Sequence, residues 1–506
     1  MAPKGGFDLT ADALVRFLGK ERQAFTREDL VKVVKANEVR MVNLNFVGGD
    51  GRLKSLSFAL RSERHLRELL ESGERVDGSS LFRYVDPARS DIYVIPRYST
   101  AFLNPFTPTP TLNILCAYFD AEGTPVDVAP EHTVTAARLA LTKATGLELY
   151  TLGELEYYAF LPPVGVDLFP ATPQRNYHES APFARCKHMN EEALHVLASI
   201  GVRSKYGHSE VGAIPTEGGG RIEQYEIEME LEPMDETADH IVLAKWVLRN
   251  IAARHGVSVT FSPKLGIGHA GSGMHVHMAA MKKGKNVMVD DRQELSETAR
   301  RVIGGLIKLA PSLTAFGNTI PASYLRLVPH QEAPTCVCWG GMNRSVLVRV
   351  PLGWRHVGNL SAQVNPTVKR GAPPGKRYQT VEIRSPDGSA NAHLLIAGIG
   401  VAARWGLASP DALPLAEQTR VSVNIFKEEH RDVRARLKEL PASCGESADC
   451  LLEQAKFYED GGVFSRRLVE GVAGQLRAFD DRQMIEDLRK DKAKAEEYAK
   501  DFLHCA

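Results

Sequence analysis

The hydrophobic residues at the start of the chain follow a helical period and then a strand-like one. Between residues 7 and 36, apolar side chains recur at helical spacing, which predicts helix over most of this segment. The period changes to two in residues 41–46 and 53–58, and Gly-Gly-Asp-Gly at residues 48–51 is a hairpin turn signal. With a further strand predicted over residues 112–119, these elements predict a small mixed α/β unit.

A larger region is predicted to begin near residue 128. Its first helix is expected over residues 130–143, and strands with polar side chains at period two follow around residues 154–160, 224–232, 344–350 and 380–384. A sheet with one polar and one apolar face predicts helices on the apolar side and a site on the polar side. We expect Glu228, Glu230 and Glu232 to be solvated, and residues 480–502 to form a solvated helix.

Composition narrows the class of protein. The chain has 506 residues, and its Lys plus Arg total of 62 equals its Asp plus Glu total of 62, which disfavours a nucleic-acid or membrane-surface binder. The sequence shows neither a signal peptide nor an apolar run of about 18 residues, so we expect a cytoplasmic protein. Seven scattered cysteines form no disulfide framework, and the close pair Cys336 and Cys338 is expected to be core.

Two short segments carry paired metal-capable side chains. Glu154 and Glu156 are two positions apart, as are His275 and His277, and this spacing on a strand points both members of a pair to one face. Carboxylates and imidazoles are costly to bury together unless a cation joins them. The candidate ligands favour Mg²⁺ or Mn²⁺ and more than one ion, and they are Glu154, Glu156, Glu210, Glu226, His275 and Glu382.

Arginines form a second group of candidate residues. Arg344 and Arg349 run from a predicted turn into a strand, Arg384 shares its strand face with Glu382, and Arg326 lies upstream. Metal-binding acids beside fixed guanidinium groups suit phosphoryl transfer, because both neutralise the charge that spreads over the moving phosphoryl oxygens. The chain has no Gly-x-x-x-x-Gly-Lys-Ser loop and no kinase signature, so a nucleotide would be held in another way.

These residues resemble the glutamine synthetase family, the ATP-dependent glutamate:ammonia ligases. The matching segments follow in order over most of the chain, and they are Asp77-Gly-Ser-Ser80, Ser90-Asp91, Glu154-Leu-Glu156, His208-Ser-Glu210, Gln224-Tyr-Glu226, the segment from Gly271 to His277, the segment from Ser323 to Pro334, Asn343-Arg-Ser345 and the segment from Glu382 to Asp387. The resemblance implies an α+β fold with a small β-grasp-like N-terminal domain and a larger catalytic domain, whose curved antiparallel sheet is covered by helices. We expect a helical extension over residues 1–24, the β-grasp-like domain over 25–127 and the catalytic domain over 128–506.

The resemblance also implies a role for each candidate residue. Glu156, Glu210 and Glu226 would hold one metal, and the other would be held by Glu154, His275 and Glu382. The remaining assignments concern substrates: Arg344 and Arg349 on the phosphoryl group, His277 near the phosphates of ATP, Gly271, Arg326 and Arg384 on the amino acid, Asp77 as the base that binds ammonium, and Glu332 on a flap over the intermediate. The family assembles in stacked rings, so the resemblance implies a homo-oligomer whose active sites lie between subunits.

Several positions depart from the family pattern. Ala270 stands where Asn is usual, and Glu210 and Glu226 are sixteen positions apart (226 minus 210) because residues 214–221 look inserted. We expect that insertion to alter the mouth of the site, and a second insertion is expected over residues 365–378. Three hypotheses follow: a glutamine synthetase, a γ-glutamyl ligase acting on a larger amine, and a non-catalytic ring-forming relative. Retention of Asp77 and of every metal ligand favours the first.

Overall fold

The protein is described from a computed structural model that covers residues 9–328, 333–353, 360–367 and 379–505. Helical structure at the N-terminus is interrupted: helix α1 (Ala13–Leu18) ends at Gly19, a 3₁₀ turn η1 (Arg22–Ala24) follows, and α2 (Arg27–Ala36) begins after a capping box of Thr26 and Asp29. The prediction of helix over most of residues 7–36 is therefore wrong between α1 and α2. Gly19 has a φ of 66°, a left-handed conformation that favours glycine and ends the helix.

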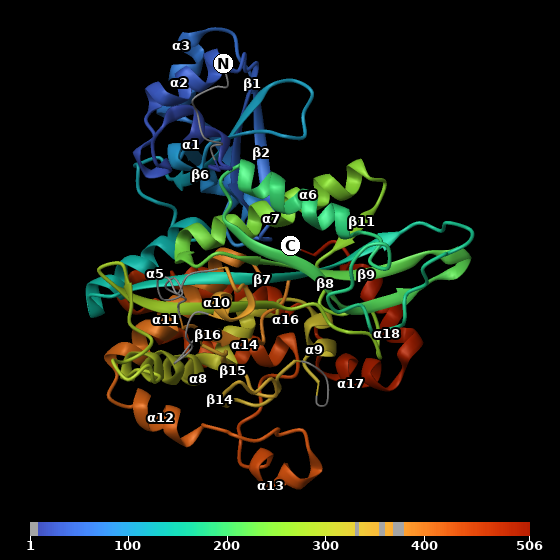
Figure 1. The fold of residues 1–506 in the computed structure, drawn as a ribbon. Helices are drawn as coiled ribbons and strands as arrows, with labels where there is room; N and C mark the ends of the chain where they lie inside the picture. The colour runs from blue at the N-terminus through green and yellow to red at the C-terminus, as the bar shows by residue number, and fades with distance from the viewer. Residues whose placement is uncertain (1–8, 329–332, 354–359, 368–378, 506) are drawn as a thin grey trace.

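A six-stranded sheet forms the N-terminal part of the chain (Figure 1). Its strand order is β2-β1-β6-β4-β3, with β5 paired to β6, and only the β1–β6 pair among these is parallel. The hairpin predicted from the glycine-rich turn is confirmed, since β1 pairs with β2 antiparallel. The bounds are β1 (Met41–Val47), β2 (Leu53–Ala59), β3 (Glu74–Asp77), β4 (Asp91–Pro96), β5 (Phe102–Leu103), β6 (Thr111–Phe119), with helices α3 (Glu63–Ser72) and α4 (Gly78–Leu81) and the 3₁₀ turns η2 (Pro87–Arg89) and η3 (Tyr98–Thr100).

A ten-stranded sheet carries the larger part of the chain. Its main order is β14-β15-β16-β12-β7-β9-β8; β10 and β11 also pair with β7, and β13 pairs with β12. The sheet is antiparallel, as predicted, except that β14 and β15 run parallel. The bounds are β7 (Glu148–Leu161), β8 (Ser204–Pro215), β9 (Arg221–Met229), β10 (Glu232–Pro233), β11 (Ser258–Thr260), β12 (Met274–Lys282), β13 (Lys285–Asn286), β14 (Trp339–Gly341), β15 (Val348–Val350) and β16 (Val381–Ile383).

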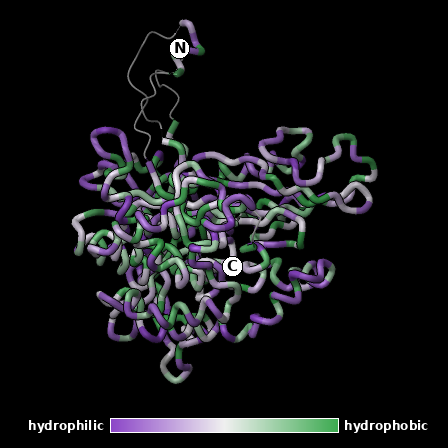
Figure 2. The backbone as a smooth tube through the Cα atoms, turned by 90° about the horizontal axis from the view of Figure 1, so that it is seen from below, coloured by the Kyte–Doolittle hydropathy of each residue, from purple (hydrophilic) through white to green (hydrophobic). Residues whose placement is uncertain are grey.

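Helices pack around this sheet and bury its apolar face, as the two-faced strands predict (Figure 1). Helices α8 and α11 contact each other and are buried along most of their lengths. The helices are α5 (Pro130–Thr145), α6 (Lys187–Ser199), α7 (Met234–Arg254), α8 (Glu297–Gly317), α9 (Pro321–Arg326), α10 (Leu360–Val364), α11 (Ala392–Ala408), α12 (Ala412–Gln418), α13 (Arg431–Arg434), α14 (Cys444–Glu453), α15 (Ala455–Glu459), α16 (Arg466–Arg477), α17 (Arg482–Lys490) and α18 (Lys492–Ala499). Hydrophilic stretches lie mainly along the outline of the backbone (Figure 2).

Buried polar contacts join the two sheets. Arg97, which follows β4, pairs with Asp239 of α7 at 2.9 Å, and His393 of α11 contacts the same carboxylate oxygen at 2.9 Å. Arg22 adds a second connection, because it donates to the backbone oxygens of Ala101 and of Ile200. The N-terminal sheet is therefore held against the helices of the larger unit by charged groups as well as by apolar packing.

Two sequence expectations about burial have different outcomes. Cys336 and Cys338 are unpaired and buried, as expected, in a small apolar cluster with Val346. Glu228 and Glu232, in contrast, are buried rather than solvated: Glu228 is 3% exposed and pairs with Lys205, while Glu232 contacts His240 at 2.6 Å. The period-two pattern identifies the face of a strand, but the cation that allows a carboxylate to be buried comes from elsewhere in the chain.

The C-terminal segment is divided into two helices, α17 and α18, and a 3₁₀ turn η7 (Lys500–Phe502), where a single helix was predicted. Its backbone also contacts the larger unit, because Leu503 accepts from Thr260 and Cys505 accepts from Arg249. Among the described helices, none is by itself long and apolar enough to cross a membrane, and one pair bent by 104°, α11 with α12, passes that test jointly.

Candidate active site

A cavity of about 1230 Å³ opens over the polar face of the ten-stranded sheet. Side chains from six strands line it: Glu154 and Glu156 from β7, His208 from β8, Glu226 and Glu228 from β9, His275 and His277 from β12, Arg349 from β15 and Glu382 from β16. Glu210 and the arginines Arg326, Arg344 and Arg384 also line it, as does Gly271. The structure thus brings together most of the residues that the sequence singles out.

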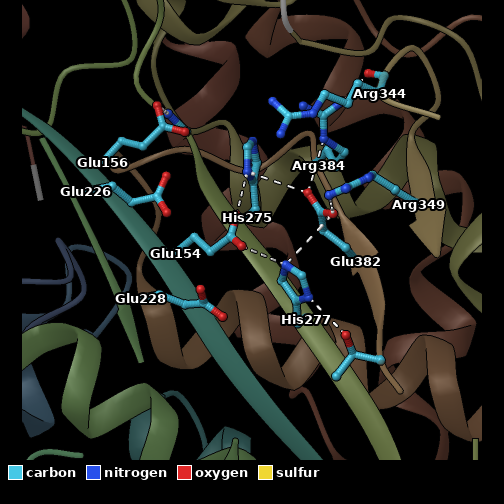
Figure 3. A network of polar contacts seen from close by, with 12 residues as sticks. Glu154, Glu156, Glu226, Glu228, His275, His277, Arg344, Arg349, Glu382 and Arg384 are labelled. Atoms are coloured by element: carbon cyan, nitrogen blue, oxygen red, sulfur yellow. Dashed lines mark hydrogen bonds and ion pairs between the residues drawn. The ribbon is translucent and has the colours of Figure 1, made fainter. Parts of the chain in front are cut away.

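Strand register explains this convergence. Glu154 on β7 lies opposite His275 on one side and Glu228 on the other, and Glu156 lies opposite Glu226. On the next strand pair, His277 lies opposite Glu382. Residues directly opposite each other on antiparallel strands project to the same face, so the i, i+2 pairs build a continuous layer of acids and imidazoles (Figure 3).

The first half of this layer surrounds Glu382, which is 1% exposed. His275 Nδ1 lies 3.0 Å from Glu154 and 3.6 Å from Glu382, and His277 Nε2 lies 2.9 Å from Glu154 and 3.8 Å from Glu382 (Figure 3). Burial lowers the pKa of His275. Burial also acts to lower the pKa of His277, but the carboxylates of Glu154 and Glu382 outweigh it and raise this pKa to about 9.

One buried nitrogen in this half, Nε2 of His277, lacks a hydrogen bond. Although His277 Nε2 lies close to Glu154, it makes no hydrogen bond of acceptable geometry and is fully buried. A buried imidazole nitrogen without a hydrogen bond, next to two carboxylates, is the environment that a divalent cation would complete. Oxygen and imidazole donors from Glu154, His277 and Glu382 lie within 4.8 Å of one another, so the residues present fit a metal ion.

The second half of the layer is richer in carboxylates. Glu156 Oε2 accepts hydrogen bonds from the backbone N–H of Gly273 at 2.8 Å and from Gln224 Nε2 at 3.0 Å. Burial, together with repulsion from neighbouring carboxylates, raises the pKa of Glu156 and of Glu226 well above the usual range. A carboxylate that is buried beside others resists ionisation, and a bound cation would remove that cost.

His208 belongs to this half, although the sequence analysis did not count it as a ligand. Donor atoms of His208, Glu210 and Glu226 lie within 4.8 Å of one another, which makes a second group that fits a metal ion. His208 lies directly opposite Glu226 in the β8–β9 register, and the 'His-Ser-Glu' spacing of residues 208–210 was the signal that could have found it.

The arginines crowd the other edge of the cavity. Arg349 donates to Glu382 at 2.9 Å and Arg384 donates to the other Glu382 oxygen at 3.1 Å. Arg384 also donates to the backbone oxygen of Arg344, and Arg326, 4% exposed, donates to the backbone oxygen of Ser385 at 2.8 Å. Guanidinium groups fixed in this way present positive charge to the cavity without needing to reorganise.

Two predicted residues are not placed in this cavity. Asp77 is exposed at the end of β3 and is not among the lining residues of the described part of the chain. Hydrogen bonds from Ser80 and Ser79 lower the pKa of its carboxyl below the usual range. Glu332 lies outside the described residues, as do residues 368–378 of the second insertion. The roles assigned to all the site residues stay predictions.

The predicted effect of the first insertion on the mouth of the site stays a prediction. Residues 214–221 complete the β8–β9 hairpin, where Pro215 pairs with Arg221 around a 3₁₀ turn η4 (Glu217–Gly219). None of these residues lines the cavity in the part of the chain that the structure describes. A register shift between Ser209 and Ala213 contains Glu210, so a bulge rather than the insertion sets the position of this carboxylate.

Comparison with known proteins agrees with this architecture. The family model for the glutamine synthetase catalytic domain matches residues 131–475, and that for the glutamine synthetase β-grasp domain matches residues 38–121. Glutamine synthetases from Clostridium saccharobutylicum and Pyrococcus horikoshii are each 30% identical, over 465 residues (90% of this chain, 96% of the relative) and 487 residues (92% and 97%).

Solved structures match the fold at lower identity. A cryo-EM structure of Plasmodium falciparum glutamine synthetase has a TM-score of 0.72 and 18% identity, and a GmaS/ADP complex has a TM-score of 0.71 and 21% identity. Each match covers 90% of this chain and 96% of the other. A β-grasp domain joined to a curled sheet, with acids, imidazoles and guanidinium groups on one face, defines a class of ligases. Within that class, the chain belongs to the glutamine synthetase family.

Proposed function

We propose that this protein is an ATP-dependent ligase that joins the γ-carboxylate of glutamate to ammonia and produces glutamine. The observation that supports this proposal is the single cavity in which two groups of metal-capable donors face fixed arginines. Nucleic acids and membranes are not expected partners. The cytoplasmic location, the stacked rings and the domain boundaries at residues 25 and 128 also remain predictions.

The proposed reaction has two steps. An oxygen of the γ-carboxylate attacks the γ-phosphorus of ATP, and the bond from that phosphorus to the bridging oxygen breaks. The products are ADP and an acyl phosphate. Ammonia then attacks the acyl carbon, the C–O bond to phosphate breaks, and the proton that the nitrogen loses passes to the departing phosphate. When bound, Mg²⁺ or Mn²⁺ would neutralise charge on the phosphoryl oxygens and screen the carboxylates from one another.

The chain's own residues supply the positive field for the first step. Arg349 and Arg384 are held by the two oxygens of Glu382, which orients both guanidinium groups toward the same edge of the cavity. His277 faces two carboxylates and is a donor for the bound ion rather than a fixed cation, so the fixed positive charges are the two guanidinium groups. These fixed charges would stabilise the phosphoryl group in the transition state.

Asp77 is proposed to bind ammonium for the second step. The lowered pKa of its carboxyl, held by hydrogen bonds from Ser80 and Ser79, favours an anion that attracts a cation and only weakly accepts a proton. Because Asp77 does not line the cavity of its own subunit, the proposal requires Asp77 to reach the cavity of a neighbouring subunit. A monomer would then be inactive.

A γ-glutamyl ligase for a larger amine is the second candidate. It is favoured by the rim of the cavity, where Tyr177 is 49% exposed and stacks on His178 at 4.3 Å between ring centroids. An exposed aromatic face near carboxylates attracts organic ammonium ions as well as ammonium itself. A non-catalytic ring-forming protein is the third candidate, and the convergence of the metal-capable residues in one cavity argues against it.

Phosphate release from ATP with a divalent ion and glutamate, measured with and without ammonium and with a panel of primary amines, tests these candidates. Ammonium-dependent release with glutamine as product is the expected result. Release only with a larger amine would move the assignment to the second candidate. If folded, oligomeric protein releases no phosphate with ammonium or with any amine, a ligase function is refuted.

A further inference from the structure

We propose that His208 Nε2 is a direct ligand of the divalent ion held by Glu210 and Glu226, and that this imidazole makes the site prefer Mn²⁺ to Mg²⁺. The inference rests on the metal centre of the proposed function. It adds a ligand that the resemblance to the family did not assign, since that resemblance gives the ion three carboxylates.

Position is the first argument. His208 on β8 lies directly opposite Glu226 on β9, and its Nε2 is 3.5 Å from Glu226 Oε1. The donor atoms of His208, Glu210 and Glu226 all lie within 4.8 Å of one another. At ordinary metal–ligand distances of about 2.0–2.2 Å, two donors of one ion lie at most about 4.4 Å apart, so His208 Nε2 and Glu226 Oε1, at 3.5 Å, are close enough to share an ion.

The hydrogen bond of the other ring nitrogen is the second argument. His208 Nδ1 lies 3.1 Å from the backbone oxygen of Ser209, and because a carbonyl oxygen only accepts, Nδ1 must be the donor. In the neutral ring, Nε2 therefore carries a lone pair and faces the carboxylate of Glu226. Two lone pairs at this separation repel unless a cation lies between them. An Nδ1–H fixed by a backbone carbonyl is also the usual support of a metal-binding imidazole.

The third argument is that the ring is held in place. The His178 ring lies 4.2 Å from the His208 ring between centroids and is tilted by 41°, and the Tyr206 ring stacks on His208 at 6.0 Å and 30°. Tyr177 contacts the His208 ring edge-on at 5.5 Å. A ring packed by three neighbours loses little further freedom when it binds an ion, so the site is prepared before the ion arrives.

Ion preference follows from donor chemistry. Mg²⁺ favours oxygen ligands and retains its water, whereas transition metal ions accept imidazole nitrogen more readily. Glu156, the third predicted carboxylate ligand of this ion, cannot supply both of its oxygens to Mg²⁺, because one of them already accepts hydrogen bonds from Gly273 and Gln224. His208 therefore supplies a donor that benefits Mn²⁺ more than Mg²⁺.

Binding of Mn²⁺ alone and of Mg²⁺ alone, measured by titration calorimetry on chelator-treated full-length protein, tests the proposal. For H208Q we expect one Mn²⁺ site to weaken by at least about tenfold, while the amide oxygen that replaces the imidazole keeps Mg²⁺ binding closer to wild type. The matched control is H195Q, at an exposed histidine of α6 that does not line the cavity, and it should leave both affinities within about twofold.

Pulsed EPR of bound Mn²⁺ is a second readout, and its measurement on wild type does not depend on the folding of any variant. Wild-type protein loaded with Mn²⁺ at both sites and labelled with ¹⁵N-histidine should show nitrogen coupling at both ions, and only one ion should show it in H208Q. Nitrogen coupling at one ion alone in wild type, or unchanged Mn²⁺ binding in H208Q, would refute the ligand role. Equal weakening of both ions would refute the preference for Mn²⁺. Absence of ligase activity with every amine would refute the proposed function and leave this binding result standing.

Discussion

Replacing Glu226 by Gln should make the metal-free protein more stable, although it removes a predicted metal ligand. Glu226 is 7% exposed, and its donor atom lies within 4.8 Å of that of Glu210. Two full negative charges at that separation repel by about 3.5 kcal/mol at an effective dielectric constant of about 20. Burial and this repulsion raise the pKa of Glu226, so protonation already relieves part of the repulsion, and a net gain of about 2 kcal/mol is expected.

Divalent ions should reverse this ranking. At an ion concentration about a thousand times its Kd, wild type gains about 4 kcal/mol from each site that binds only the folded state. If loss of one ligand weakens binding about a hundredfold, E226Q gains only about 1.4 kcal/mol at the same concentration. Wild type should therefore be the more stable protein with the ion, and E226Q the more stable one in chelator.

Apparent unfolding midpoints at one scan rate are the appropriate assay, because large proteins often unfold irreversibly. The matched control is E228Q on the same strand. Glu228 is also buried, and burial raises its pKa, but it is paired with Lys205 at 2.6 Å, so E228Q should raise the midpoint in chelator less than E226Q does. A midpoint for E226Q at or below that of wild type in chelator would refute the reasoning. It would mean that repulsion between the carboxylates does not destabilise the folded, metal-free protein.

The pH dependence of stability gives an independent check that the ionised Glu226 carboxylate destabilises the metal-free protein. Burial and the nearby carboxylates of Glu154 and Glu210 raise the pKa of Glu226, so the folded protein holds this proton more tightly than the unfolded chain. The metal-free protein should therefore lose stability as pH rises above about 4.3, the pKa of an unfolded glutamate, until the folded pKa is reached. E226Q should lose less stability than wild type over the same pH range. Equal slopes of stability against pH in the two proteins would contradict this prediction.

Three further predictions concern catalysis and the contact between the two sheets. Asp77→Asn keeps one acceptor oxygen for Ser79 but loses the charge, so kcat should fall at least about a hundredfold with little change in the unfolding midpoint; wild-type ammonium kinetics would contradict this. Asp239→Asn leaves Arg97 without its carboxylate and should cost about 2–3 kcal/mol, measured by denaturant unfolding, and an unchanged midpoint would contradict it. Arg349→Lys replaces the fork on Glu382 with a point charge, so phosphate release should drop about tenfold or more; wild-type rates would contradict this.

Period-two patterning could predict the polar layer because strand geometry is local. The pairs Glu154/Glu156 and His275/His277 each project to one face whatever their neighbours are, and antiparallel pairing then places them opposite one another. The break between α1 and α2 was not predicted, because a single left-handed Gly19 ends a helix that the apolar spacing would allow to continue. Burial of Glu228 was also missed, since it depends on Lys205, a residue on a different strand.

Ligand spacing in sequence is a poor measure of ligand spacing in this site. Glu210 and Glu226 are sixteen positions apart (226 minus 210), yet donor atoms of both lie within 4.8 Å of each other. The hairpin makes this possible: residues added at its end lengthen both strands together and leave the register between His208 and Glu226 unchanged. Shortening the hairpin end by matched pairs should therefore preserve metal binding. Deleting a single residue from one strand alone should abolish it, because a one-residue slip turns the carboxylates to the opposite face of the sheet.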